Sequence, residues 1–449
     1  MAESGMQETR SVTLLPATAI VVGNMVGTGV FTSLGFQVLG IQSGFVLLVL
    51  WALGGVCALC GALCYGELAA ALPRSGGEYH LLSRIFHPAL GFLAGWISIT
   101  VGFAAPIALG AMAFGTYVSG IMTWEGEFVA EALSVVVVLL VATIHLLHIG
   151  VGSRFQSVCT SLKVVFIVVL ISSAFFIGEP QGISFLPQDG DLTLLGSHSF
   201  AISLVFVMYA YTGWNAATYI VDEVKEPRKT VPRALFLGTV LVMVLYLGLN
   251  AAFLHSTPIP EMRGKLDVGL IAAKSIFGEA GGRMMASLIC FGLISALSAM
   301  TWAGPRVAQR MGQDLKAFRL LARTSRTGIP FVAVLWQSAV VLLLIATSTF
   351  DAVLVYIELL LVFFAMLTVA GVFWLRFTQP DLERPVKTWG YPVTPLIFIS
   401  VSVWMMIYVA QEKPMGALWG VVTLAVGGVV YLAAQRTQIR SSGKGSRKE

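Results

Sequence analysis

Charged residues are scarce in this sequence. Asp, Glu, Lys and Arg make up 11% of its 449 residues, and hydrophobic residues make up 57%. Soluble domains carry about 25% charged residues, and disordered chains are much poorer in apolar residues. The apolar residues form continuous runs, which excludes the alternating pattern of a membrane β-barrel. Because ~20 apolar residues cross a bilayer as a helix, the sequence predicts an all-α polytopic membrane protein with little soluble mass.

Cysteine is missing from every predicted loop, so we expect no disulfide. Cys57, Cys60 and Cys64 fall on one helix face without a nearby His or carboxylate, so packing is a better interpretation than a metal site. The sequence also lacks a nucleophile–base pair, a phosphate loop and a metal motif, so we expect neither enzyme activity nor a metal or cofactor. The polar first ten residues give no cleavable signal. The five cysteines are Cys57, Cys60, Cys64, Cys159 and Cys290.

The apolar runs predict twelve spans, separated by Gly, Pro and charge clusters. With the N-terminus in the cytoplasm, 22 Lys and Arg residues fall in cytoplasmic segments and 5 in outer segments. This bias predicts that both termini are cytoplasmic. The basic tail at 436–449 is interpreted as a solvated, lipid-facing end and not as a nucleic-acid site. The expected spans are 12–39, 43–72, 88–120, 127–148, 154–178, 199–222, 232–256, 282–310, 329–348, 351–378, 391–411 and 414–435.

The first and sixth spans are predicted to be interrupted. The first contains GNMVGTGVF at residues 23–31, and the sixth contains YAYTGWNAATY at residues 209–219. Glycine costs ~1 kcal/mol relative to alanine inside a helix. An interrupted helix survives at membrane depth only where its freed backbone groups line a protein cavity. Both stretches are therefore candidate cavity walls.

The two interruptions lie five spans apart, so the second unit is inverted relative to the first, and paired broken helices point to a site at the membrane midplane. A half-helix that begins near Gly29 presents free amides and a positive dipole end, which suits a carboxylate. A half-helix that ends near residues 209–212 leaves free carbonyls, which suit an ammonium group. Together they predict a site for a zwitterionic amino acid. The alternative is that Gly23 and Gly27 form a GxxxG pattern that only lets helices touch.

Three motifs carry a resemblance to a known family. They are GTGVF at residues 27–31, YGELAAALPRSGGEYHLLSRIF at residues 65–86, and YAYTGWNAATYIVDEVKEPRKTVPRA at residues 209–234. The sequence resembles the amino acid–polyamine–organocation superfamily, most closely its L-type amino acid transporter branch. The resemblance implies a five-plus-five inverted repeat over 12–178 and 199–378, with two further spans in 391–435.

The resemblance also implies site residues. The substrate carboxylate is expected at the backbone of Gly27, Thr28 and Gly29. The ammonium is expected at the carbonyls of Met25 and of the sixth span. Tyr209 takes the place of an aromatic gate residue that is usually Phe, and Asn215 matches a polar position just after the break. The expected carbonyls of the sixth span belong to Tyr209, Ala210 and Thr212.

Lys163 is the one Lys or Arg residue that the count assigns to neither side of the membrane. It lies nine residues beyond Arg154, or about 13–14 Å further into the membrane. A buried ammonium there costs ~2.5–3.5 kcal/mol on insertion scales, so we predict bonds to carbonyls near Gly23 and to the hydroxyl of Ser295 or Ser298. The resemblance implies that this lysine takes the place of the sodium ion of sodium-coupled relatives. The sequence leaves open whether it is a permanent strut or carries a coupled proton.

Three carboxylates inside or at the ends of spans also need an interpretation. Glu67 is interpreted as a structural ion pair or cap rather than a proton relay. Glu223 is predicted either to latch a cytoplasmic gate with Lys225 or to form a loop salt bridge of no consequence. For Glu358, deep in the tenth span, a functional role as gate or relay and a structural role stay open.

These observations predict a sodium-independent exchanger of neutral L-amino acids that works by alternating access. The alternatives are a proton-coupled symporter of amino acids or cationic amines, and a membrane receptor or scaffold that does not transport. The loop at 123–128 has no cysteine, whereas the resemblance implies that animal L-type members join a glycoprotein heavy chain through a cysteine there. We therefore expect a bacterial plasma-membrane (inner-membrane) protein without a disulfide-linked heavy chain.

Overall fold

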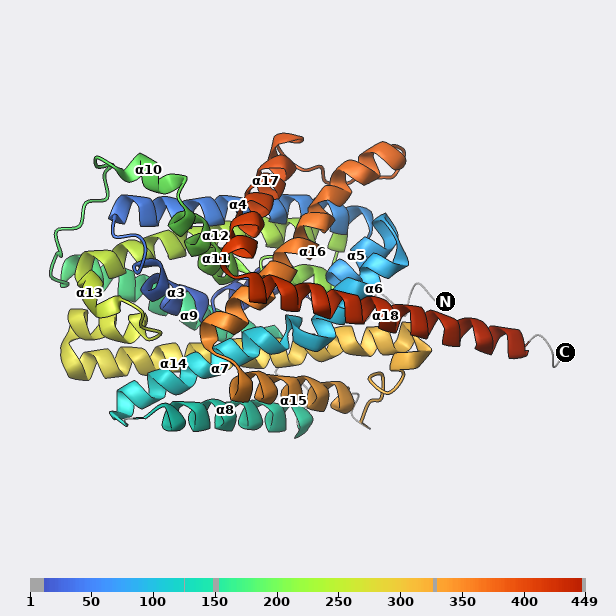
Figure 1. Cartoon of the computed structure of the whole chain (residues 1–449), viewed down its shortest axis with the longest axis horizontal. Coiled ribbons are helices and arrows are strands. Elements are labelled where there is room, and N and C mark those ends of the chain that lie inside the picture. The colour runs from blue at the N-terminus through green and yellow to red at the C-terminus, as the bar shows by residue number, and fades with distance from the viewer. Residues whose placement is uncertain (1–11, 125, 148–152, 326–328, 446–449) are drawn as a thin grey trace.

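The computed structural model describes residues 12–124, 126–147, 153–325 and 329–445; within these ranges the regular secondary structure is helical, and one isolated bridge joins Val12 and Val224. Figure 1 shows most of the long helices running roughly along the long axis of the molecule. The main helices are α2 (Leu14–Met25), α3 (Gly29–Gln37), α4 (Gly44–Ala71), α5 (Gly77–Ile85), α6 (Pro88–Ile97), α7 (Ala104–Met122), α8 (Glu127–Leu147), α9 (Ser153–Phe176), α11 (His198–Tyr211), α12 (Pro227–Ser256), α14 (Val268–Asp314), α15 (Phe331–Thr347), α16 (Phe350–Thr378), α17 (Val393–Glu412) and α18 (Pro414–Gly445). Two short helices, α10 (Asp191–Leu195) and α13 (Ile259–Met262), lie in loops.

Among the described residues, ten helical segments are long and apolar enough to cross a membrane, counting α2 with α3 as one and α6 with α7 as one. The all-α polytopic class is therefore confirmed. The predicted spans 199–222 and 329–348 correspond to the shorter apolar helices α11 and α15, so the count of twelve stays a prediction. Within α14, Gly278 is non-helical, with φ of +70°, and divides the element into two helices; the part after Gly278 corresponds to the predicted eighth span, 282–310.

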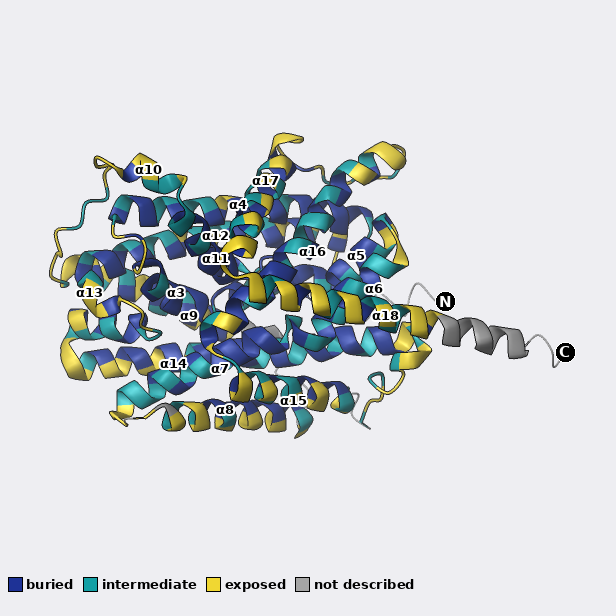
Figure 2. Ribbon diagram, viewed as in Figure 1, coloured by how far each residue is buried: buried dark blue, intermediate teal, exposed yellow. Residues whose placement is uncertain are grey.

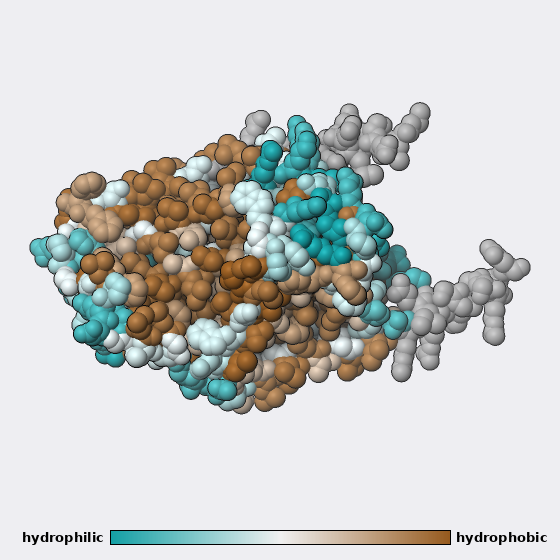
Figure 3. Space-filling model, turned by 90° about the horizontal axis from the view of Figure 1, so that it is seen from above, coloured by the Kyte–Doolittle hydropathy of each residue, from teal (hydrophilic) through white to brown (hydrophobic). Residues whose placement is uncertain are grey.

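The helices pack as two neighbouring groups (Figure 1). In one group, α12 contacts α2, α4 and α9, and α11 contacts α3 and α4; in the other, α7 contacts α8 and α14, and α15 contacts both α7 and α8. Figure 2 shows that α3 and α11 are mostly buried, whereas α8 and α18 carry exposed faces. The exposed side chains on these outer helices include Leu139, Leu140, Trp419 and Val421. Figure 3 shows a broad apolar surface between hydrophilic ends, as a lipid-facing protein requires.

The segments that the charge bias assigned to the cytoplasm meet at one end of the molecule. Val12 exchanges backbone hydrogen bonds with Glu223 and Lys225, at 3.0 and 2.8 Å. The backbone N–H of Asp222 donates to Ser75 Oγ at 2.9 Å, which joins the loop after α11 to the turn before α5. At the opposite end, Gly264 N donates to Gly35 O at 2.8 Å. The N-terminal segment, the turn before α5 and the loop after α11 therefore share one face of the bundle.

Glu67 lies at that face, buried between two residues that donate hydrogen bonds to it and a second arginine. Arg376 donates to both carboxylate oxygens, from Nε at 3.0 Å and from Nη2 at 2.7 Å. Thr388 donates through its backbone N–H at 2.7 Å and its hydroxyl at 2.8 Å. Arg384 lies 3.5 Å away. The side chain of Glu67 is 2% exposed, so this geometry supports a structural ion pair.

Replacing Glu67 by glutamine is expected to lower the free energy of unfolding by about 3 kcal/mol, because it leaves the cations of Arg376 and Arg384 without their counter-charge in a buried place. Thermal unfolding of the purified protein in detergent measures the loss. The control is Glu383→Gln, since Glu383 pairs with Arg228 at 2.7 Å but is 72% exposed. Its effect should not exceed about 1 kcal/mol. Equal losses in the two variants would contradict the structural role of Glu67.

Candidate functional site

The first span is interrupted between α2 and α3. The last regular helix residue of α2 is Met25, and α3 begins at Gly29. Val26 leaves the helical conformation with ψ of 82°, and the N–H of Gly27 turns back to donate to Met25 O at 2.8 Å. A helix leaves its first N–H groups and its last carbonyls without intrahelical partners. Residues 26–28 therefore separate the C-terminal end of α2 from the N-terminal end of α3, and both ends have backbone groups without intrahelical partners.

The sixth span is interrupted after Tyr211, where α11 ends. Thr212 is extended, with ψ of 143°, and Gly213 has φ of +103°, a conformation that favours glycine. The chain then continues as two short 3₁₀ turns, at Ala216–Tyr219 and Val221–Glu223, and not as an α-helix. The predicted span 199–222 is thus helical only in its first part.

The two breaks lie against each other. An added Cβ at Gly29 would be 2.4 Å from Ala210 Cα, and one at Gly213 would be 3.0 Å from backbone atoms of Asn24. The hydroxyls of Thr28 and Tyr209 are 3.2 Å apart and share a hydrogen bond. The sequence placed these residues in one site, and the structure brings them into contact. Gly29 therefore has a packing role in addition to any role in binding.

A tyrosine that the sequence did not single out joins the two breaks. The hydroxyl of Tyr246, on α12, lies 2.6 Å from Met25 O and 3.1 Å from Ala210 O. Tyr246 is fully buried. Since a hydroxyl has one proton, it donates to one of these carbonyls at a time. Tyr246 thus occupies one of two backbone acceptors that were expected to bind an ammonium group, and Met25 O is the nearer one.

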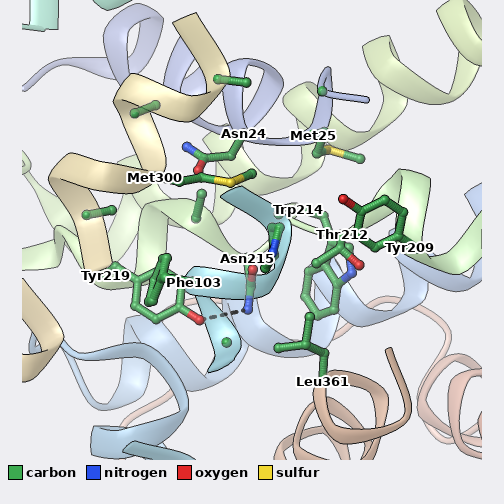
Figure 4. A pocket seen from close by; sticks show the side chains of 18 of the residues that line it. Asn24, Met25, Phe103, Tyr209, Thr212, Trp214, Asn215, Tyr219, Met300 and Leu361 are labelled. Atoms are coloured by element: carbon green, nitrogen blue, oxygen red, sulfur yellow. Dashed lines mark hydrogen bonds between the residues drawn. The ribbon is translucent and has the colours of Figure 1, made fainter. Parts of the chain in front are cut away.

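A cavity of about 170 Å³ lies beside the breaks and is also lined by α14 and α16. Figure 4 shows Asn24, Thr212 and Asn215 around it, with Tyr219, Met300 and Leu361 on the other sides. A second pocket of about 420 Å³ shares Tyr219 and Trp302 with it and extends to the end where the charged loops meet. Trp214 lines the cavity and also packs edge-on against Tyr65, with ring centroids 4.7 Å apart.

Two buried carboxylates line this cavity, on either side of the sixth-span break. Glu78, from α5, accepts hydrogen bonds from Tyr65 at 2.9 Å, from Tyr219 at 2.6 Å and from Asn215 at 2.5 Å. Glu358, from α16, accepts one from the hydroxyl of Thr212 at 3.2 Å. Sequence reasoning noted Glu358 but gave Glu78 no role. The signal that could have identified Glu78 was its position within the family motif at residues 65–86.

Lys163 reaches the first break, where it bonds to a carbonyl three residues beyond Gly23, but it has no recorded bond to Ser295 or Ser298. Its Nζ donates to Val26 O at 3.2 Å, and the residue is only 6% exposed. Ser298 Oγ instead pairs with His145 at 2.8 Å, and the buried Ser295 Oγ has no partner among the described residues. The carbonyl that Lys163 contacts belongs to Val26 because Gly23 lies within α2, whereas Val26 follows the last residue of that helix.

Glu223 also has a different partner from the one expected. Arg306, on α14, donates to its carboxylate at 2.6 Å, and neighbouring Asp222 accepts from Arg310 at 3.1 Å. Lys225, the expected partner, instead donates its backbone N–H to Val12. The link therefore joins the loop after the sixth span to the C-terminal end of α14, whereas the predicted pair lay within one loop.

Comparison with known proteins agrees with this architecture. Residues 12–433 match the amino acid permease family. The mouse b(0,+)-type amino acid transporter 1 is 28% identical over 433 residues, which cover 94% of this chain and 87% of that protein. The mouse large neutral amino acids transporter small subunit 2 is 26% identical over 444 residues, covering 95% of this chain and 81% of that protein.

These matches extend over nearly the whole chain, and they concern transporters and not enzymes. They confirm the resemblance that the three sequence motifs indicated. The chain therefore belongs to the amino acid permease family of the amino acid–polyamine–organocation superfamily, whose members are membrane transporters.

Proposed function

We propose that this protein is a sodium-independent exchanger of neutral L-amino acids that works by alternating access. The observation that carries the proposal is the contact between two interrupted helices beside a cavity. An N-terminal helix end at Gly29 suits a carboxylate, and polar acceptors around Thr212 suit an ammonium group. The backbone of Gly27, Thr28 and Gly29 and the residues Met25, Tyr209, Ala210, Thr212 and Asn215 form the proposed site.

The proposed architecture is an inverted repeat of 12–178 and 199–378, followed by the helices of 391–435. It rests on interrupted spans at corresponding places in two units of opposite orientation. The proposed location is the plasma membrane, with both termini in the cytoplasm, in keeping with the charge bias. The chain is proposed to work without a disulfide-linked heavy chain, since 123–128 holds no cysteine.

The proposed cycle alternates access between the two ends of the cavity. The second pocket adjoins the cavity at the end where the charged loops meet, and the close contact of α3 with α11 lies on its other side. This supports a conformation in which the site communicates with the cytoplasm. The pairs Glu223–Arg306 and Asp222–Arg310 line the second pocket and are the proposed cytoplasmic gate.

A proton-coupled symporter of amino acids or cationic amines remains the second candidate. The observation that favours it is the pair of carboxylates in the cavity wall, Glu78 and Glu358. Either could accept a proton or face a second positive charge on a substrate. The sequence had offered only Glu358 for this purpose.

Uptake into liposomes separates the two candidates. We expect purified protein to take up labelled neutral amino acid only when the vesicles contain unlabelled amino acid, with equal rates in sodium and choline buffers. A pH gradient alone should add little. Uptake that needs a proton gradient but no internal amino acid would favour the symporter, and binding without any flux would favour a receptor.

A further inference from the structure

Two of the four backbone carbonyls expected to bind the substrate's ammonium group, those of Met25 and Tyr209, already accept hydrogen bonds. A carbonyl oxygen has two lone pairs. Met25 O accepts from Tyr246 and from the N–H of Gly27, so both of its lone pairs are used. Ala210 O lies 3.1 Å from the same Tyr246 hydroxyl, and Tyr209 O accepts from the N–H of Thr212 at 3.0 Å. When Tyr246 donates to Met25 O, the carbonyls of Ala210 and Thr212 are the neutral acceptors at the breaks, and a charged acceptor would bind an ammonium group more strongly than they do.

Glu358 is the charged acceptor next to the sixth-span break. It lies within α16, is 1% exposed and lines the cavity. Its recorded hydrogen bond comes from Thr212, whereas an ionised carboxylate offers about four acceptor positions. Among the described residues, no Lys, Arg or His lies within ion-pair distance of it. Burial of a charge without a counter-charge is costly.

Glu78 provides an internal comparison. It lines the same cavity, but three hydrogen bonds from Tyr65, Tyr219 and Asn215 surround its carboxylate. These three donors fill most of the acceptor positions of this carboxylate. Two carboxylates thus contact the sixth-span break, Glu358 at Thr212 and Glu78 at Asn215, and Glu358 has more acceptor positions free.

We propose that Glu358 binds the substrate's ammonium group and is the residue that selects for a protonated amine. This inference rests on the proposed function, since it assumes that the cavity binds an amino acid. Thr212 orients the carboxylate from one side, and Tyr246 occupies Met25 O and so directs the ammonium toward Glu358. The N-terminus of α3 remains available for the substrate's carboxylate at the other side of the breaks.

The test compares two ligands in two variants of the full-length protein. The ligands are the amino acid that the wild type exchanges best and its deaminated analogue, a carboxylic acid with the same carbon skeleton. In Glu358→Gln, which keeps the shape and the acceptor for Thr212, the amino acid should bind at least tenfold more weakly. The deaminated analogue should bind within about twofold of its wild-type affinity or more tightly. Competition against labelled amino acid in detergent measures both.

Glu78→Gln is the matched control, because it removes the other carboxylate of the same cavity. It should leave the ratio of the two affinities unchanged. Should Glu358→Gln fail to fold, Glu358→Asp keeps the charge on a shorter arm and should retain part of the preference for the amine.

Three results would overturn the proposal. One is an equal loss of affinity for both ligands in Glu358→Gln. Another is unchanged amino acid binding in that variant with loss of proton-driven uptake, which would make Glu358 a proton carrier. The third is a loss of amine preference in Glu78→Gln as large as in Glu358→Gln. If the wild type binds no amino acid, the proposed function fails first, which distinguishes the two failures.

Discussion

Replacing Gly29 by alanine is expected to lower amino acid affinity by at least a hundredfold. The new Cβ would lie 2.4 Å from Ala210 Cα and 2.7 Å from its Cβ, in space that backbone atoms occupy. These atoms cannot move aside as the end of a flexible side chain can, so α3 must shift away from α11. That shift moves the helix N-terminus proposed to bind the carboxylate. Equilibrium binding of labelled amino acid and exchange in liposomes measure the effect.

Overpacking costs typically 1–3 kcal/mol, so the Gly29 variant should remain folded but with a lower unfolding temperature. Gly428→Ala is the matched control, since this glycine lies on α18 with nothing within 4 Å of an added Cβ. It should keep wild-type affinity and exchange. Gly27→Ala is a second comparison, because the nearest atom to its Cβ, Met25 O, is 4.0 Å away; its thermal stability should match that of the wild type. A folded Gly29→Ala protein with unaltered affinity would contradict the role assigned to this break.

The breaks could be predicted from sequence because their cause is local. Glycine in the middle of an apolar run is costly in a regular helix, and Gly29 and Gly213 each stand in such a run. The structure gives both a reason that the sequence could not provide. Gly213 needs a positive φ, and Gly29 needs space for Ala210, which lies 181 residues away along the chain. Local composition therefore located the interruptions but not the surface that they face.

The partners of the site residues could not be predicted, because tertiary packing decides them. Tyr246 is one of several aromatic residues in its apolar span, and no local sequence pattern distinguishes it from a residue that only packs. The same holds for Glu78, whose three donors come from α4 and from the 3₁₀ region after α11. A sequence shows that a buried carboxylate needs donors, but it does not show which distant helix provides them.

The charge bias of the loops, by contrast, predicted which segments share a face. It depends on a sum over many residues, so single errors matter little. The contacts of Val12 with the loop after α11, and of Glu67 with the loop after α16, bring those segments together. The charge count could not predict which residues pair within that face: Glu223 pairs with Arg306 and not with Lys225.

Replacing Lys163 by methionine is expected to reduce exchange by about 10- to 100-fold. Methionine keeps an unbranched side chain but removes the charge and the hydrogen bond to Val26 O, which lies in the first break. Hydrogen bonds to charged groups contribute about 1.5–3 kcal/mol, and each 1.4 kcal/mol is a factor of ten. Without this donor, the carbonyl at the break loses its link to α9. Initial exchange rates in liposomes measure the loss, with binding measured in parallel.

Thr160→Val is the control for Lys163→Met, because Thr160 joins the same two helices. Its hydroxyl donates to Ala19 O at 3.1 Å, but Ala19 lies inside α2 and not at the break. If a link between α9 and α2 were all that mattered, both variants would lose exchange alike; we expect Thr160→Val to stay within about threefold of the wild type. Lys163→Ala adds a second readout, since it also removes the side chain that is proposed to take the place of a sodium ion. Partial recovery of exchange in sodium buffer, but not in choline buffer, would support that proposal, and normal exchange in both buffers would make the lysine incidental to transport.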